Sequence, residues 1–414
     1  MVGLGVKEII TYLWLALIPT QLGRHFWLVE SRVLGMKIDY LSIILYLSDI
    51  LWVGWIIKNH PLTPSLTKEG DKTKNFWNRW LMVVLVLAIV VGNVVVAQAK
   101  LVAVYRWLRV GQWLFTFYLV SKNKKDIEEK LLKVIPWWII IESFLALAQV
   151  VKGGSLQGIW WWFGERRFLL GNLGIAEMRV GNEAWVRAYG TFSHPNSLAG
   201  FLLLAWIWWR KSPALRAPPL RKGGILKWVV NWSALLGIVL AGSRTVWVLS
   251  ILILIQETRN EKQELKGVVE KVLIGIGLVA MVLGIVGNEY ELKSFLGGWD
   301  KDSWSKRVSL VVSAKNMFID SPFLGIGNGN FVSLLPKYQE KNIFWLQPVH
   351  NIFLLILSEI GIFGVVLLCK MFGRIRKKNW QILGIIIVTG MLDHYWVTLP
   401  QNFWLAAIIL GLMR

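Results

Sequence analysis

The chain has 414 residues, of which 55% are hydrophobic and only 17% are charged, and its 46 basic residues outnumber its 25 acidic residues by 21. Soluble globular chains carry about 25% charged residues, and disordered or basic nucleic-acid-binding chains are poor in large apolar residues, so the composition argues against both classes. The single cysteine, Cys369, excludes a disulfide framework and a cysteine-based zinc site. What remains is a polytopic membrane protein.

Apolar runs recur along the whole chain. A transmembrane helix needs roughly 20 mostly apolar residues, and only helices satisfy their own backbone polar groups in lipid. We therefore predict an all-α, polytopic membrane fold with about 12 transmembrane helices. The predicted segments are 8–26, 40–57, 80–98, 100–120, 134–151, 196–209, 228–242, 245–256, 272–288, 351–369, 380–397 and 400–413. The first is expected to remain uncleaved, because no small-residue cleavage site follows it.

Basic residues in the loops predict the orientation. The loops 58–79, 121–133, 210–227, 257–271 and 370–379 together hold 25 basic and 9 acidic residues. The two long loops of the opposite set, 152–195 and 289–350, hold 12 basic and 9 acidic residues. Because Lys and Arg concentrate in cytoplasmic loops, the first set and both termini are predicted to be cytoplasmic and the two long loops external. Most of the excess of basic over acidic residues is then explained by the orientation of the chain in the membrane.

Tryptophan clusters, among them Trp160-Trp161-Trp162, fall near predicted helix ends. An aromatic belt at the membrane interface explains most of them. External tryptophans could instead stack on sugar rings.

A polar motif precedes the sixth predicted helix and reads Arg187-Ala-Tyr-Gly-Thr-Phe-Ser-His-Pro-Asn196. Gly190 and Pro195 favour a turn, and Asn196 is well placed to cap the following helix. Arg187 and His194 are candidates for substrate binding, with a purely structural histidine as the alternative.

Two further arginines lie at predicted helix ends on the external side. In Gly242-Ser243-Arg244 a positive charge separates two apolar runs. The arginine side chain is expected either to snorkel to the lipid headgroups or to form an anion site. The two apolar runs form either two short helices or one broken helix. Arg307 precedes the stretch 308–319, whose apolar residues recur at helical spacing and predict a helix on the external membrane face. The glycine-rich 320–331 lacks the Lys-Ser/Thr of a phosphate-binding loop.

The pair His350-Asn351 lies at the external start of the tenth predicted helix. The helix dipole disfavours a charged histidine there, which suits a neutral imidazole that accepts a proton. Gly361 and Gly364 further along allow close packing. A histidine held by loop backbone is the alternative interpretation.

Charged residues also occur within or beside apolar segments. Arg106, Arg109 and the pair Asp393-His394 are either functional groups or mutually paired inside the bundle. The spacing of two carboxylates in Asp300-Lys301-Asp302 is better explained by a solvated turn than by a metal site.

Together these motifs resemble the O-antigen ligase family and its O-antigen polymerase relatives. His350-Asn351, nine residues and Gly361 follow the ligase pattern His-Asn/Ser/Gln-x9-Gly, and the resemblance covers about 10–410 with a core at 196–370. The segments 190–196, 242–244 and 322–327 resemble the domain that ligases and polymerases share. The chain departs from the pattern at Val248, where a leucine is frequent.

The resemblance implies a GT-C-like, inverting glycosyltransferase that needs no metal or cofactor, with short helices in the large external loop. Such enzymes move a glycan from undecaprenyl diphosphate to an acceptor, such as lipid A-core, at the outer face of the bacterial inner membrane. The implied partners are the lipid-linked donor, the acceptor and membrane lipids, and no nucleic acid. The alternatives are an O-antigen polymerase, a protein O-oligosaccharyltransferase and, in a different class, a lipid-linked glycan transporter.

By motif, the resemblance assigns the catalytic roles to His350, Arg244 and Arg307. Six further residues are expected to bind or position substrate: Arg187, His194, Asn196, Asn351, Asp393 and His394.

Overall fold

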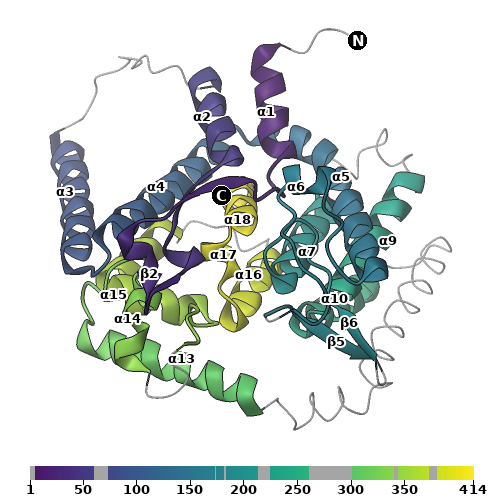
Figure 1. Cartoon of the computed structure of the whole chain (residues 1–414). Coiled ribbons are helices and arrows are strands. Elements are labelled where there is room, and N and C mark those ends of the chain that lie inside the picture. The colour runs from purple at the N-terminus through teal and green to yellow at the C-terminus, as the bar shows by residue number, and fades with distance from the viewer. Residues whose placement is uncertain are drawn as a thin grey trace.

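The computed structural model describes residues 5–59, 73–172, 174–180, 183–212, 224–260, 301–339, 344–372 and 380–414. The predicted helix 272–288, Asp300 and parts of the predicted cytoplasmic loops lie outside these residues. The described chain is mostly helical, as predicted, and Figure 1 shows its helices gathered in one bundle.

The helices follow the apolar runs of the sequence. They are α1 (Val6–Ala16), α2 (Leu47–Asn59), α3 (Thr73–Val96), α4 (Lys100–Lys122), α5 (Lys124–Lys152), α6 (Ile159–Trp162), α7 (Pro195–Lys211), α9 (Gly224–Ala241), α10 (Arg244–Asn260), α13 (Lys301–Asp320), α14 (Phe331–Tyr338), α15 (Ile352–Phe372), α16 (Trp380–Leu392), α17 (Tyr395–Thr398) and α18 (Pro400–Met413). The apolar runs 228–242 and 245–256 thus form two separate helices, α9 and α10.

Among the described residues, three two-stranded antiparallel sheets interrupt the helical pattern, although the sequence analysis predicted none. Their strands are β1 (Gly23–Phe26) with β4 (Ile43–Tyr46), β2 (Arg32–Val33) with β3 (Met36–Lys37), and β5 (Glu177–Val180) with β6 (Glu183–Val186). Two short 3-10 helices, η1 (Val29–Ser31) and η2 (Asp39–Leu41), complete this part of the chain.

The predicted boundaries of the first two helical segments were therefore wrong. The segment 8–26 ends its helix at Ala16, and 40–57 begins its helix only at Leu47. Strand β1 starts at Gly23, which pairs with Tyr46 so closely that a Cβ at Gly23 would lie 2.8 Å from the Tyr46 ring. Strand pairing at this glycine replaces the continued helix.

Two described helices, α5 and α9, are both long and apolar enough to cross a bilayer. Shorter apolar stretches of 10–17 residues lie in α3, α10, α15, α16 and α18. The number of about 12 spans stays a prediction.

Helices α7 and α18 lie at the centre of the bundle. Nearly every residue of both helices is buried, which is typical of a helix that other helices surround. Figure 1 shows α18 and its neighbours α16 and α17 between α2–α4 on one side and α5, α7 and α9 on the other. Helix α18 packs on α4 and α7, and α5 packs on α9.

Helix α15 is broken at Gly361, where φ is +63°. The N–H groups of Ile362 and Phe363 donate to the carbonyls of Pro322 and Phe323, at 2.9 and 3.2 Å. Gly361 permits this approach, because a Cβ there would lie 2.4 Å from the Phe323 carbonyl oxygen. The close packing predicted for this glycine therefore involves the glycine-rich loop after α13.

The loop satisfies the carbonyls that the break sets free. The N–H groups of Ile326 and Gly327 donate to the carbonyls of Ser358 and Glu359, both at 3.0 Å. Every backbone group freed by a kink in an apolar bundle needs such a partner. This exchange fixes the glycine loop against the helix that begins beside His350.

Candidate functional site

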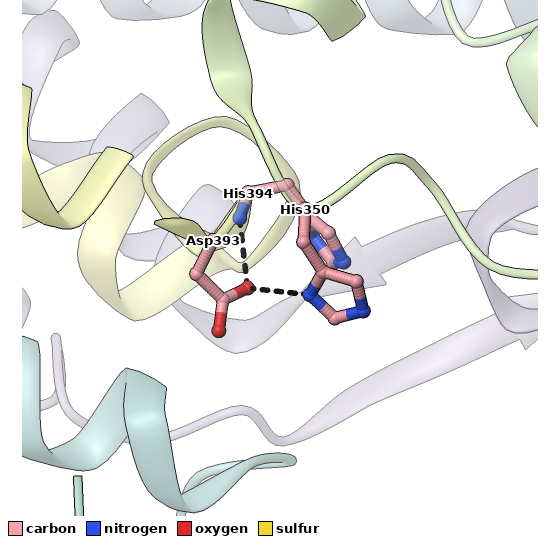
Figure 2. Close-up of side chains that lie close together, drawn as sticks. All are labelled: His350, Asp393 and His394. Carbon is pink, nitrogen blue, oxygen red and sulfur yellow. Dashed lines mark hydrogen bonds and ion pairs between the residues drawn. The ribbon is translucent and has the colours of Figure 1, made fainter. Parts of the chain in front are cut away.

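Figure 2 shows His350, Asp393 and His394 together at one end of the bundle. His350 immediately precedes the N-terminus of α15, and Asp393-His394 connects α16 to α17. The Asp393 carboxylate faces Nδ1 of His350 at 3.6 Å and accepts the backbone N–H of His394 at 2.8 Å. The two imidazole rings lie 5.3 Å apart. The structure thus brings the motif histidine beside the second charged pair of the sequence.

The cluster continues into the motif before α7. Asn196 donates from Nδ2 to Asp393 at 2.9 Å and accepts from the Arg187 guanidinium at 2.6 Å. Arg187 Nε in turn donates to the carbonyl of Ala241, the last residue of α9, at 2.9 Å. Four segments far apart in the sequence are therefore joined by one polar network.

His194, and not Asn196, caps α7. The His194 side chain accepts the N–H of Asn196 at 3.2 Å, and Pro195 occupies the first helical position. Because the helix begins one residue earlier than predicted, the Asn196 amide is released for Arg187 and Asp393. The prediction that Asn196 caps this helix was wrong.

Asn351 fixes His350 from the other side. Its side-chain oxygen accepts the N–H groups of Phe353 and Leu354, at 2.9 and 3.0 Å, and its Nδ2 donates to the Met391 carbonyl at 3.1 Å. These bonds tie the start of α15 to the end of α16, and hence His350 to Asp393.

Burial and charge act in opposite directions on this cluster. Burial lowers the pKa of His194 to about 4 and that of His394 to about 3, although the Asp393 charge opposes both shifts. Burial alone would raise the pKa of Asp393. The contact with His350 and the charges of the neighbouring imidazoles have the larger effect, and they hold the pKa of Asp393 well below its usual range. Near neutral pH, Asp393 is therefore an anion, and His194 and His394 are neutral.

Nδ1 of His350 is buried and has no hydrogen-bond partner within ordinary distance. Its Asp393 neighbour at 3.6 Å is close enough to attract a proton on that nitrogen.

His350, Asp393 and His394 also offer ligand atoms within 4.8 Å of one another, which could hold a metal ion. A tetrahedral zinc ion would need its ligand atoms about 3.4 Å apart. A proton and a metal would compete for the same His350 lone pair.

A cavity of about 1120 Å³ begins beside the cluster. His194, Pro348 and Ile352 line it next to His350, and Tyr40, whose ring lies 5.5 Å from that of His394, lines it too. Its lining is polar where loops contribute, and apolar along the helices. The apolar lining comes chiefly from Ile352, Ile356, Val365 and Cys369 of α15, Ile386 and Ile387 of α16, Ala406 and Leu410 of α18, and Trp113 and Leu114 of α4.

The two predicted catalytic arginines, Arg244 and Arg307, are not among the residues that line this cavity. Arg244 begins α10 and is exposed. Two residues before it, a Cβ at Gly242 would lie 3.0 Å from Arg187 Nε, which explains the glycine of this motif. Arg307 is partly exposed on α13, a helix that packs on α15. The predicted helix over 308–319 is confirmed within the longer α13, where Arg307 lies inside the helix and not at its start.

Three arginines that the site prediction omitted line the cavity, namely Arg106, Arg109 and Arg166. Arg106 donates to the Tyr40 carbonyl at 2.7 Å, and Arg166 donates to the Ser193 carbonyl at 3.1 Å. Neither of these two guanidinium groups has a carboxylate within ion-pair distance among the described residues. The position of Arg106 in an apolar run could have identified it. Arg166 lies in a loop without a motif, so no sequence pattern pointed to it.

Arg109, one turn further along α4, has a different environment. It contacts Asp49 directly and donates to Gln112 at 2.7 Å. Mutual pairing, the alternative considered for this residue, is what the structure shows.

A mostly helical chain of membrane composition, with an acid–base cluster beside a long and partly apolar cavity, fits the class of membrane enzymes that act on lipid-linked substrates. A family model described as "O-Antigen ligase" matches residues 229–369, and this match supports the O-antigen ligase family. It also supports a membrane glycosyltransferase of the O-antigen ligase/polymerase type. No curated protein matches the chain. His350, Arg244 and Arg307 lie inside the matched segment, whereas Arg187, Asn196 and Asp393 lie outside it.

Proposed function

We propose that this protein transfers a glycan from undecaprenyl diphosphate to a hydroxyl of lipid A-core or a similar surface glycan, with inversion and without a metal. The observation that carries the proposal is the His350–Asp393 pair beside a cavity with one polar and one apolar end. The reaction belongs at the external face of the inner membrane, with both termini in the cytoplasm.

The apolar end suits a polyprenyl tail. Its α15 lining extends from Ile352 to Cys369 and so includes residues on both sides of the break at Gly361. A lipid chain lying along α15 could therefore remain at membrane depth while its head group reaches the cluster.

The polar end suits the diphosphate leaving group. Arg106 lines the cavity with no carboxylate at ion-pair distance among the described residues. The resemblance adds Arg244 and Arg307. A guanidinium presents a planar fork that matches phosphate oxygens and stays charged at any physiological pH. Charge grows on the diphosphate as its bond to the sugar breaks, so positioned arginines stabilise the transition state more than the ground state.

His350 is the candidate general base. With Asp393 facing Nδ1, the tautomer that carries its proton on Nδ1 leaves the Nε2 lone pair free. As the acceptor oxygen bonds to the anomeric carbon, the C–O bond to diphosphate breaks and the hydroxyl proton passes to Nε2. Asp393 stabilises the imidazolium that results. Arg187 and Asn196 hold Asp393 in place through the network described above.

Purified protein in lipid nanodiscs, given an undecaprenyl-diphosphate-linked glycan and lipid A-core, tests the proposal. We expect glycan-modified acceptor and a large loss of rate in Arg244→Lys, which keeps the charge but loses the fork. Donor chains that lengthen without acceptor would identify a polymerase, and glycan on a Ser or Thr of a protein would identify a protein transferase.

A deletion strain separates transfer from transport. We expect lipid-linked glycan to accumulate on the outer face of the inner membrane. Glycan retained on the inner face would instead indicate a transporter and contradict the proposal.

A further inference from the structure

We propose that the outer part of the cavity contains a glycan subsite, in which Trp161 stacks on a sugar ring and Arg166, His25 and Ser42 meet its hydroxyls. All four residues line the cavity on its loop side. The inference rests on the proposed function, which it deepens by locating the sugars that follow the diphosphate. It also gives a role to one tryptophan of the run at 160–162.

Trp161 is a large apolar surface that the fold does not cover. The residue is 51% exposed and lines the cavity, with the ring of Trp162 packed edge-on against it at 4.9 Å. Trp162 is 65% exposed but is not among the residues that line the cavity. An aromatic face left open inside a polar cavity mouth suits the C–H face of a pyranose ring.

The loop that carries Trp161 is held rigidly. The buried Glu165 carboxylate accepts the N–H groups of Leu156 and Gln157, at 2.8 and 2.6 Å, and the Gln149 side chain, at 2.8 Å. Gln157, just before α6, has φ of +65°, a conformation that a non-glycine residue keeps only where surrounding contacts enforce it. A loop that is already ordered loses little conformational entropy when a ligand binds.

The same loop is fastened to the residues just before strand β1. Gly164 has φ of +93°, and a Cβ there would lie 2.7 Å from the Gln21 backbone nitrogen. The Gln21 side chain donates to the Gly164 carbonyl at 2.9 Å. These two segments, which both line the cavity, are therefore fixed relative to one another.

Polar side chains complete the subsite. His25 Nδ1 lies 2.9 Å from the Ser42 hydroxyl, and its ring is stacked on Trp27 at 5.3 Å. Arg166 uses one Nη to hold the Ser193 carbonyl at 3.1 Å, next to His194, which leaves further N–H groups of its fork for a ligand. A planar aromatic face surrounded by such donors and acceptors favours a sugar over a lipid chain, whose apolar lining lies along α15.

Kinetics of two adjacent tryptophans test the subsite. We expect Trp161→Ala to raise the KM for a long-glycan donor about tenfold, the equivalent of one lost aromatic stacking contact, with little change in kcat. A donor with a single sugar should show no such change. Trp161→Phe should recover most of the affinity. Trp162→Ala removes a ring that packs on Trp161 but does not line the cavity, so we expect a smaller effect. Equal effects of Trp161→Ala and Trp162→Ala would overturn the proposal.

Binding without transfer separates this inference from the proposed function. The probe is the free oligosaccharide released by mild acid from the cell's own lipid-linked glycan, detected by saturation-transfer NMR on protein in nanodiscs. We expect binding to wild type and to Trp162→Ala, and loss in Trp161→Ala, even if no acceptor is ever modified. Binding that is absent from wild type, or equal in wild type and Trp161→Ala, would overturn the subsite while leaving transfer intact.

Discussion

Two acid–base pairs occupy different regions of the bundle, and they contrast sharply. Asp49 and Arg109 are in direct contact between α2 and α4, and the Arg109 guanidinium is covered by the rings of Phe403 and Trp404 at 4.8 and 5.6 Å. Asp393 and His350 face one another at 3.6 Å, and the histidine nitrogen has no hydrogen bond.

This difference distinguishes a pair that stabilises the fold from a pair that can take part in a reaction. A buried charge that is fully paired and covered holds helices together, and its partner has no capacity left for a substrate. A buried donor or acceptor left unsatisfied costs free energy, so its retention beside a cavity indicates a functional constraint. Both pairs qualify as intramembrane or membrane-edge charges by sequence, and only their partners distinguish them.

Removing the base should have the largest effect on activity. We expect His350→Ala to slow transfer about 10²–10⁴-fold, the usual contribution of a general base. Its thermal unfolding midpoint in detergent should fall only modestly, because Asp393 keeps its hydrogen bonds from Asn196 and from the His394 N–H. Near-full activity would show that another group takes the proton.

Breaking the structural pair should reduce stability and not chemistry. Asp49→Asn leaves the Arg109 charge buried without its anion, and we expect about 3–5 kcal/mol of lost stability. Denaturant titration in micelles measures the loss. Glu129→Gln is the control, because its pair with Lys133 is exposed and should contribute little. Equal effects of the two substitutions would contradict the structural role.

The same substitution at the second aspartate should act on chemistry. Asp393→Asn keeps an amide oxygen that can accept the His394 N–H, so the fold should persist. It removes the anion that favours protonated His350, so we expect a smaller loss of rate than in His350→Ala. A rate equal to that of wild type would mean that Asp393 only supports the fold.

Acidification should weaken the cluster gradually. His194 and His394 have an ordinary pKa of 6.5 but about 4 and 3 in the fold, so the unfolded chain binds their protons first as pH falls. The unfolding midpoint should therefore be highest above pH 6.5 and decline from there toward pH 4. His394→Gln should flatten the decline, and an equally steep decline in that variant would contradict the assignment.

Sequence patterns predicted the helices better than the turns between them. Long apolar runs located α4, α5, α7 and α18, because burial in lipid or protein favours helix at all of them. The strands from Gly23 to Tyr46 are only two to four residues long and fall within or beside apolar runs, where a helix was the stronger expectation.

The sequence predicted which residues belong to the site, but it did not predict how they contact one another. The motif residue His350 and the charged pair Asp393-His394 were identified separately, but nothing in the sequence indicated that Asp393 and Asn196 would bond. The cap at His194 depends on Pro195 fixing the helix start, which outweighed the general preference for asparagine at caps. Arg166 depends entirely on how its loop folds.

We infer that the His350–Asp393–His394 cluster moves a proton and does not hold a metal. Glycan transfer by the purified wild-type protein tests this inference, measured untreated, after chelation with EDTA and again after adding back Zn²⁺ or Mn²⁺. We expect the same rate in all three conditions. A rate that is lost on chelation and restored by the metal would contradict it.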